Sequence, residues 1–153
     1  MITVREASLE DLDVLLIMEQ GVVTAERPFD SSLKNEGVKY YDIKDLINSP
    51  ESSLVVATVN EQVVASGYAT IRESKEYVLY SKYAYLGFMY VLPEHRGKGI
   101  NALILKALSS WSKSQNVTNL KLDVYIKNVA AIKAYKKLNF KNCMVEMRLD
   151  LNQ

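Results

Sequence analysis

The chain has 153 residues, of which 48% are hydrophobic and 24% are charged. This length and composition predict one globular domain spanning residues 1–153, and they exclude a disordered chain. Since 19 basic residues are balanced by 18 acidic ones, the net charge gives no reason to expect binding to nucleic acid or to an anionic membrane.

Hydrophobic periodicity and turn residues predict the elements of the first half of the chain. The capping residue Ser8 opens a helix that continues to about Val23. The apolar face of this helix is expected to consist of Leu9, Leu12, Leu15, Leu16 and Met18. The other expected elements are a strand over 2–6, a loop over 25–35, a helix over 38–47, and strands over 54–59 and 63–71 that flank a turn at 60–62.

In the second half, strands and helices are expected to alternate. The expected strands cover residues 83–91, 120–126 and 145–149, and the expected helices cover 99–113 and 129–138. No internal repeat or low-complexity linker interrupts this order. The whole series therefore predicts an α/β protein.

A basic, glycine-bearing turn separates the strand at 83–91 from the helix at 99–113. Gly97 and Gly99 allow the backbone to approach an anion closely, and Arg96 and Lys98 add positive charge. The start of a helix also offers unpaired N–H groups and a partial positive charge. The turn therefore favours a diphosphate.

The turn also has two other interpretations. One is a surface loop whose glycines serve only the backbone geometry. The other is a dinucleotide fingerprint, because Gly97, Gly99 and Ala102 fit G-x-G-x-x-A and Asp123 follows about twenty residues later. The context opposes the fingerprint, since residues 93–96 separate the turn from its strand. The P-loop pattern is absent.

A second motif follows, with the pattern N-x-x-A-x-x-x-Y-x-K-x-x-F from Asn128 to Phe140. Together with the turn Arg96-Gly97-Lys98-Gly99, it makes the chain resemble the GCN5-related N-acetyltransferase (GNAT) family, whose acyl-CoA signature is R/Q-x-x-G-x-G/A. The resemblance is strongest over residues 83–140. The chain departs from the signature at its last position, which is usually small and is Asn101 here.

The resemblance implies the GNAT fold, a mixed, mostly antiparallel sheet flanked by helices on both faces. It also implies acetyl-CoA as co-substrate and no metal. The cofactor is expected between the splayed strands 83–91 and 120–126, where Gly87 permits a bulge and a strand N–H polarises the thioester carbonyl. The implied cofactor-binding residues are Met89, Tyr90, Val91, Arg96, Gly97, Lys98, Gly99, Ile100, Asn101, Asn128, Ala131 and Tyr135.

Tyr135 is the candidate acid of the reaction. It lies seven positions after Asn128, so two helical turns place both residues on one face of the helix. A phenol is protonated at neutral pH, and the resemblance implies that Tyr135 protonates the departing CoA thiolate. The alternative is an ordinary packing role.

A carboxylate is expected to remove the proton from the incoming amine. The candidates are Glu26, Glu73 and Asp123, with Glu26 and Glu73 preferred. Each of them also has a structural interpretation, as an ion pair, a solvated residue or a strand contact. His95 is not favoured, because the expected layout puts it on the phosphate side of the strand.

The chain is therefore predicted to be an N-acetyltransferase that acts by direct attack of a primary amine in a ternary complex. Tyrosines and charged residues in the segments 25–30, 40–41 and 77–85 are expected to bind a small-molecule or peptide amine. Two alternatives stay open, a non-catalytic acetyl-CoA-binding module that regulates a partner protein and a donor with another acyl chain. The apolar–polar alternation at 144–149 is compatible with a homodimer.

Cys143 and His95 are the single cysteine and the single histidine of the chain. They exclude an internal disulfide and the usual zinc site. The first residues lack the apolar core of a signal peptide, and no apolar run reaches the length of a membrane span. A cytoplasmic protein without membrane association is expected.

Overall fold

The computed structural model describes residues 1–152 of the chain. They form two compact units, one from Met1 to Asp123 and the other beginning at Val124. The first unit contains the sheet and the helices that pack on it.

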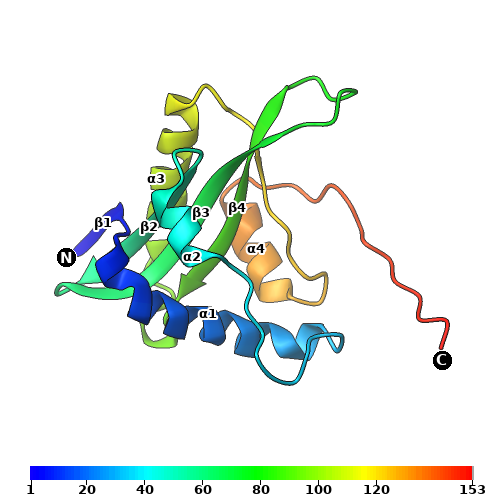
Figure 1. The fold of residues 1–153 in the computed structure, drawn as a ribbon, viewed down its shortest axis with the longest axis horizontal. Coiled ribbons are helices and arrows are strands. Elements are labelled where there is room, and N and C mark those ends of the chain that lie inside the picture. The colour runs from blue at the N-terminus through cyan, green and yellow to red at the C-terminus, as the bar shows by residue number, and fades with distance from the viewer. Residues whose placement is uncertain (153) are drawn as a thin grey trace. The chain divides into compact units, whose positions relative to one another are not determined.

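The first unit is built on a five-stranded sheet in the order β1-β2-β3-β4-β5 (Figure 1). Its strands are β1 (Ile2–Glu6), β2 (Ser52–Val59), β3 (Gln62–Glu73), β4 (Lys82–Val91) and β5 (Leu120–Lys121). Neighbouring strands are antiparallel except β4 and β5, which are parallel. This confirms the predicted mixed, mostly antiparallel sheet.

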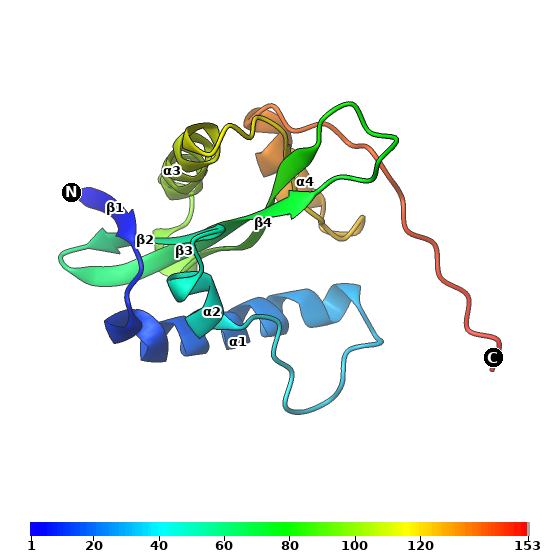
Figure 2. The same ribbon diagram turned by 45° about the horizontal axis from the view of Figure 1, so that its top comes forward.

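Helices cover both faces of this sheet, as the sequence predicted (Figure 2). The helices α1 (Leu12–Glu26) and α2 (Ile43–Asn48) lie on one face, and α3 (Ile100–Ser114) lies on the other. A Cβ atom at Gly67 of β3 would lie 2.5 Å from the Ile104 side chain of α3 and 2.7 Å from the Met89 sulfur. Gly67 therefore lets α3 approach the sheet closely.

The core between the sheet and α1 and α2 consists of eight buried side chains, namely Leu15, Met18, Val22, Ile43, Leu54, Val56, Tyr68 and Phe88. Burial of apolar side chains is the main favourable contribution to folding. Phe88 and Tyr68 are members of this core, so the core extends to the middle of β4, where the pairing with β3 is irregular.

The predicted inner face of the first helix is partly wrong. Leu15 and Met18 are buried, but Leu9 and Leu16 are 53% and 38% exposed. A 3-10 turn over Leu9–Asp11 precedes α1. Because a 3-10 turn has three residues per turn, it does not continue the phase of the α-helix that follows it.

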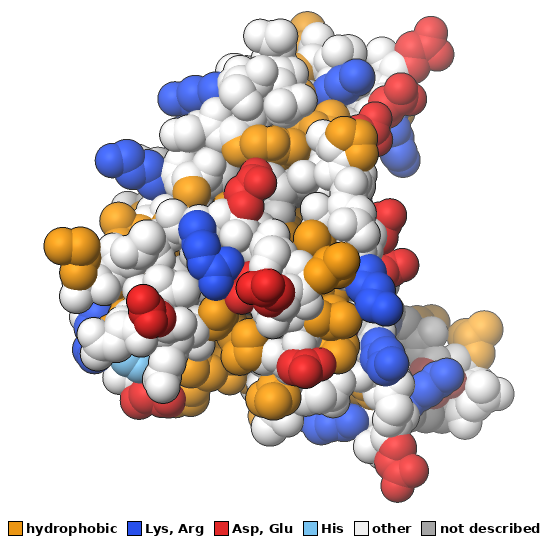
Figure 3. Space-filling view, turned by 60° about the vertical axis from the view of Figure 1, so that its left-hand side comes forward, with side chains coloured by type: hydrophobic (Ala, Val, Ile, Leu, Met, Phe, Trp, Pro, Cys, Tyr) orange, Lys and Arg blue, Asp and Glu red, His pale blue; other side chains and the backbone are white. Residues whose placement is uncertain are grey.

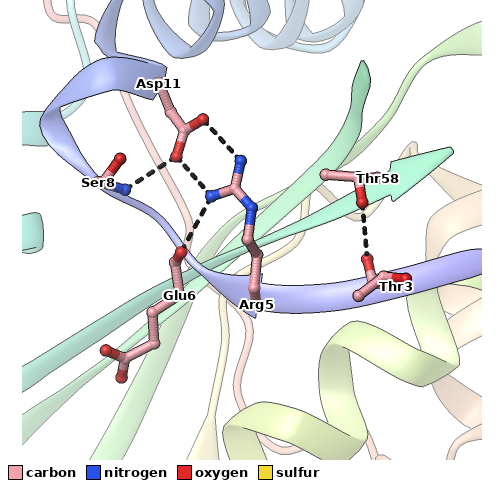
Figure 4. A network of polar contacts seen from close by, with 6 residues as sticks. All are labelled: Thr3, Arg5, Glu6, Ser8, Asp11 and Thr58. Atoms are coloured by element: carbon pink, nitrogen blue, oxygen red, sulfur yellow. Dashed lines mark hydrogen bonds and ion pairs between the residues drawn. The ribbon is translucent and has the colours of Figure 1, made fainter. Parts of the chain in front are cut away.

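A polar network fixes the start of α1 to the edge strand β1 (Figure 4). The Arg5 guanidinium donates two hydrogen bonds to the Asp11 carboxylate, at 2.8 and 2.9 Å. The backbone N–H of Ser8 donates to the same carboxylate at 2.8 Å. The bidentate pair and the backbone bond lower the pKa of Asp11 below its ordinary value, with the Arg5 hydrogen bonds as the largest cause.

The second helix is shorter than the expected 38–47, because residues 38–42 form no helix. The backbone N–H groups of Tyr40 and Tyr41 donate to the side chain of Glu19 in α1 instead of to helical carbonyls. α2 then begins at Ile43 and is capped by Asp42, whose carboxylate accepts the backbone N–H of Asp45 at 3.1 Å. The predicted hairpin turn is confirmed, since Asn60 and Glu61 have φ values of 49° and 67° between β2 and β3.

The second unit contains α4 (Val129–Lys137), close to the expected helix over 129–138. Asn128 caps it, because its Oδ1 accepts the backbone N–H of Ala131 at 3.2 Å. The strand predicted over 145–149 is wrong, since residues 141–150 form neither helix nor strand. Met144, Met147 and their apolar neighbours are exposed there. Alternation predicts an extended backbone, but a strand also needs a hydrogen-bonded neighbour.

Basic and acidic side chains are interspersed on the face shown in Figure 3, in keeping with the balanced net charge. Within residues 1–152, no helix is long and apolar enough to cross a bilayer. Over the same residues, no group of three His, Cys, Asp or Glu side chains is arranged to hold a metal ion.

Candidate active site

The strand β4 carries a bulge opposite Gly67. Tyr68 pairs with Gly87 and Ser66 pairs with Tyr90, so two residues of β4, Phe88 and Met89, face a single residue of β3. The backbone of Phe88 is in the left-handed region, with φ of 53°, which is strained for an aromatic residue. The buried Ser66 hydroxyl donates to the Phe88 carbonyl at 2.8 Å and holds the bulge.

The sequence placed the bulge near Gly87, and the structure gives this glycine a different reason. A Cβ atom at Gly87 would collide with the ring and hydroxyl of Tyr68. Gly87 is therefore required so that the Tyr68 side chain can lie across β4, and the positive φ falls on Phe88 instead.

One edge of β4 is open beside this bulge. The parallel partner β5 pairs only at Ala84–Leu120 and Tyr85–Lys121, so the strand predicted over 120–126 is reduced to two residues. Within residues 1–152, no strand pairs with that edge of β4 from Leu86 onward. Backbone N–H and C=O groups along an open edge can bind an extended ligand, as they would bind another strand.

Met89, Tyr90 and Val91, the expected strand contacts of the cofactor, all lie on this open segment. The side chain of Tyr90 faces α1, since a Cβ atom at Gly21 would lie 2.8 Å from its ring. The side chain of Met89 faces α3 at Gly67. Only their backbone groups are therefore available at the strand edge.

The predicted glycine turn follows β4. A 3-10 turn over Pro93–His95 leads into Gly97 and Gly99, which both have φ of 77°. A Cβ atom at either glycine would meet no atom within 4 Å. The space above the turn is thus open, and glycine is favoured there for its backbone conformation. Gly99 is the capping residue of α3, so the free N–H groups of the first helical turn lie here.

The other predicted residues of the turn have distinct positions. The Arg96 Nε donates to the Val91 carbonyl at 2.8 Å, and its guanidinium lies 5.4 Å from the centre of the Tyr90 ring. Arg96 therefore ties the turn to the end of β4. Lys98 is exposed, Ile100 is buried and anchors α3, and Asn101 is half-buried in its first turn.

An aromatic cluster lies on the other side of the bulge. The Tyr41 ring stacks on Phe88 with centroids 4.7 Å apart and planes at 25°. The edges of the Tyr40 and Tyr68 rings approach Tyr41 with centroid distances of 5.7 and 5.8 Å. The cluster connects the bulge in β4 to the segment before α2.

Glu26, a candidate base, lies at the end of α1 and belongs to this cluster. Burial raises its pKa, the hydrogen bond from the Tyr40 hydroxyl lowers it, and the charge of Asp30 raises it further. The net shift is upward from the ordinary value of 4.5. A half-buried carboxylate with a raised pKa accepts a proton more readily than an ordinary carboxylate, which suits a general base.

The structure does not bring the other candidate bases to the same place. Glu73 is exposed at the end of β3, paired across the ladder with Lys82, and alternation turns it to the face opposite Arg72. Asp123 accepts a hydrogen bond from the Tyr85 hydroxyl at 2.9 Å. That bond and burial raise the pKa of the Tyr85 phenol, with burial the larger cause.

Glu19 is a functional candidate that the sequence reasoning missed. Its side chain is 1% exposed in α1, and its Oε2 accepts the N–H groups of Tyr40 and Tyr41, each at 2.8 Å. It therefore fixes the backbone that carries both tyrosines. A carboxylate between Met18 and Val22 on the inner face of a helix was the signal that could have revealed it.

The remaining predicted residues lie in the second unit, with Asn128 as the N-cap of α4 and Ala131 and Tyr135 within the helix. Asn128 and Ala131 form the helix cap, and the Tyr135 ring contacts Phe140 edge-on with centroids 5.6 Å apart. Tyr135 is half-buried.

The mixed sheet, its bulged fourth strand and the glycine turn before α3 are the features of the N-acetyltransferase fold. The family model for the Acetyltransferase (GNAT) family matches residues 20–140. The chain belongs to this family.

Relatives agree with this assignment. The N-alpha-acetyltransferase of Saccharolobus solfataricus is 26% identical over 144 residues, which cover 94% of this chain and 82% of the relative. A tetramutant of the BH1408 protein from Bacillus halodurans has the same fold, with a TM-score of 0.83, 22% identity and coverage of 97% and 99%. A predicted acetyltransferase from Clostridium acetobutylicum, solved with acetyl-CoA, matches with a TM-score of 0.74, 20% identity and coverage of 99% and 97%.

Proposed function

We propose that this protein transfers an acetyl group from acetyl-CoA to a primary amine of a small molecule or peptide, by direct attack in a ternary complex. The observation that carries the proposal is the bulge in β4, which adjoins an open strand edge and runs into the glycine turn of α3. Two comparisons support it, because one relative is an N-alpha-acetyltransferase and one structure of the same fold was solved with acetyl-CoA.

The chain offers two features that fit acetyl-CoA. The pantetheine amides would bond to the backbone of Met89, Tyr90 and Val91 at the open edge. The diphosphate would bind above the turn Arg96–Asn101, where a glycine Cβ would meet no atom and helical N–H groups are free. Asn128, Ala131 and Tyr135 are proposed as further contacts from the family motif alone.

In the proposed step, the amine nitrogen forms a bond to the acetyl carbon while the carbon–sulfur bond breaks. A backbone N–H of β4 near the Phe88 bulge stabilises the charge that develops on the carbonyl oxygen. The strain at Phe88 supports this role, because strained backbone is concentrated at functional sites.

Two side chains handle the protons. Glu26 accepts the proton that the amine loses, directly or through a water molecule. Tyr135 donates a proton to the departing thiolate, as the motif N-x-x-A-x-x-x-Y implies. The transfer needs no enzyme nucleophile, and Cys143 is an exposed residue of the second unit.

The proposal is tested by calorimetric titration with acetyl-CoA, CoA and NAD in parallel. Saturable binding of both CoA species, without binding of NAD, is expected. Absence of CoA binding, or binding of NAD at similar affinity, would contradict the proposed donor site and favour the dinucleotide interpretation of the turn.

A further inference from the structure

A cavity of about 320 Å³ lies on the α2 face of the sheet, beside the bulged strand. Tyr68, Thr70 and Arg72, alternate residues of β3, contribute to its lining. The remaining lining residues are Tyr40, Tyr41, Asp42, Asp45, Leu46 and Ser52. Tyr41 stacks on Phe88 and Tyr68 lies across Gly87, so the cavity adjoins the bulge at which the amine is proposed to react.

Arg72 is an exposed residue of this lining whose guanidinium lies over an aromatic ring. The central carbon of its guanidinium lies 4.0 Å from the centre of the Tyr85 ring. The Tyr85 hydroxyl in turn donates to Asp123 at 2.9 Å. No ion pair found among residues 1–152 includes Arg72. A stacked guanidinium with free N–H groups is preorganised for a planar anion such as a carboxylate.

The guanidinium points back along the sheet toward the bulge. Arg72 itself pairs with Tyr83, but its guanidinium lies over Tyr85, which pairs with Thr70. The pair Tyr68–Gly87 is two residues further along, or roughly 7 Å at the rise of a strand. A carboxylate bound by Arg72 and an amine at the bulge could therefore belong to one small molecule, with only a few covalent bonds between the two groups.

The cavity also carries negative charge, from Asp42 and Asp45 of the α2 segment. These carboxylates, in a lining that also contains Tyr40 and Tyr41, suit the ammonium form in which a free amine arrives. A lining with both signs of charge favours a ligand with both signs over a neutral amine or a diamine.

We propose that Arg72 binds a carboxylate of the acceptor, and that the cavity thereby selects amino carboxylic acids whose carboxylate is a few bonds from the reacting amine. This inference rests on the proposed acetyl transfer and names the acceptor class of that same site. Arg72 is the specificity-determining residue, and it takes no part in proton transfer.

The test compares α-, β- and γ-amino carboxylic acids, each with its own primary carboxamide, as acceptors in a thiol-release assay. The carboxamide keeps the shape of the acid, removes the negative charge and replaces one acceptor oxygen by a donor NH₂ group. The kcat/KM for acids is expected to exceed that for carboxamides about tenfold or more. Equal or better use of carboxamides, or of short peptides with a free N-terminus, would overturn the inference.

Two variants locate the effect. Arg72→Gln should abolish the preference for acids, whereas Lys113→Gln, which removes a charge from an exposed position on α3, should preserve it. Persistence of the preference in Arg72→Gln would contradict the role of Arg72. Thermal unfolding of each variant verifies that it is folded.

Binding separates this inference from the proposed function. If no acceptor is acetylated, the same acids are titrated into the CoA-saturated protein by calorimetry. Binding that is lost in Arg72→Gln would support the acceptor class while contradicting the acetyl transfer. Absence of binding by every acid would overturn the acceptor class.

Discussion

The buried carboxylate of Glu19 accepts the backbone N–H of Tyr41 at 2.8 Å, across 22 positions of the chain. The same oxygen accepts the N–H of Tyr40 at 2.8 Å. Tyr41 stacks on Phe88 of the bulge, and Tyr40 bonds to Glu26. Glu19 therefore positions the aromatic cluster beside the bulge at which the amine is proposed to react.

Glu19→Ala is expected to lower the free energy of unfolding by about 2–5 kcal/mol, because it leaves two part-buried N–H groups without an acceptor. Glu19→Gln retains one carbonyl oxygen and should cost less. Urea denaturation measures both. In Glu19→Gln the KM for the acceptor should rise while the affinity for acetyl-CoA is unchanged, and equal losses in both would contradict a local positioning role.

The pH dependence of turnover should report Glu26. A base acts in its ionised form, so kcat/KM for the acceptor falls as the pH decreases through the pKa of Glu26. Because burial raises this pKa, the fall is expected above the ordinary value of 4.5. Glu26→Gln should remove this limb of the profile and reduce kcat about 10²- to 10⁴-fold. Glu36→Gln, which changes an exposed residue in the following loop, is the control. If the fall of kcat/KM at low pH persists in Glu26→Gln, another group is the base.

The glycine turn can be tested with a matched pair of substitutions. Gly99 and Gly37 have φ of 77° and 70°, and a Cβ atom at either would meet no protein atom within 4 Å. Alanine at each should therefore cost a similar 1–2 kcal/mol or so in stability, from the backbone conformation alone. Only Gly99→Ala should weaken acetyl-CoA binding, by about tenfold, since its methyl group would occupy the phosphate site. Equal affinities in the two variants would contradict a diphosphate at the turn.

Tyr135→Phe should reduce kcat more than it weakens acetyl-CoA binding, because the proposed role needs only the hydroxyl proton. The measurement is a single-turnover rate, in which product release does not limit. Tyr125→Phe removes a hydroxyl from another half-buried tyrosine of the second unit and serves as the control. An unchanged single-turnover rate would assign Tyr135 to packing.

The ion pair between Arg5 and Asp11 predicts a loss of stability in acid. The pKa of Asp11 is lowered in the folded protein, so its contribution is present above the ordinary value of 3.8 and is lost as the pH falls through the lowered pKa. Asp11→Asn should lower the free energy of unfolding by about 1–3 kcal/mol at pH 7. The lower end of this range is expected, because the Arg5 side chain is partly exposed to solvent. This cost should shrink at pH 3, and Asp13→Asn, an exposed control, should cost little at either pH.

Local patterns predicted much of the fold because each carries its own physical cause. The glycines at 97 and 99 mark positive φ values, and Asn128 marks a helix cap. Alternation located β2, β3 and β4 within two residues or so at their ends. The residue types of the turn favoured a diphosphate, and only the resemblance to the GNAT family named CoA, so the diphosphate site stays a prediction.

Features that depend on distant contacts were not predictable in this way. The φ of Phe88 follows from the two-for-one pairing with Gly67, and the short α2 follows from the bonds to Glu19. The length of β5 depends on the number of residues over which it pairs with β4, which is two. The preference for Glu26 over Glu73 likewise depends on the sheet. Glu73 follows Arg72 in β3, but its side chain lies on the opposite face of the sheet from the cavity that Arg72 lines.

Amine-dependent release of CoA thiol from acetyl-CoA, with mass-spectrometric identification of the product, tests the central claim most directly. The proposed function predicts thiol release only when protein and a primary amine are both present, together with the N-acetylated amine in equal amount. Tight binding of acetyl-CoA without an acetylated product from any amine would contradict it, and would instead identify a regulatory acetyl-CoA-binding module.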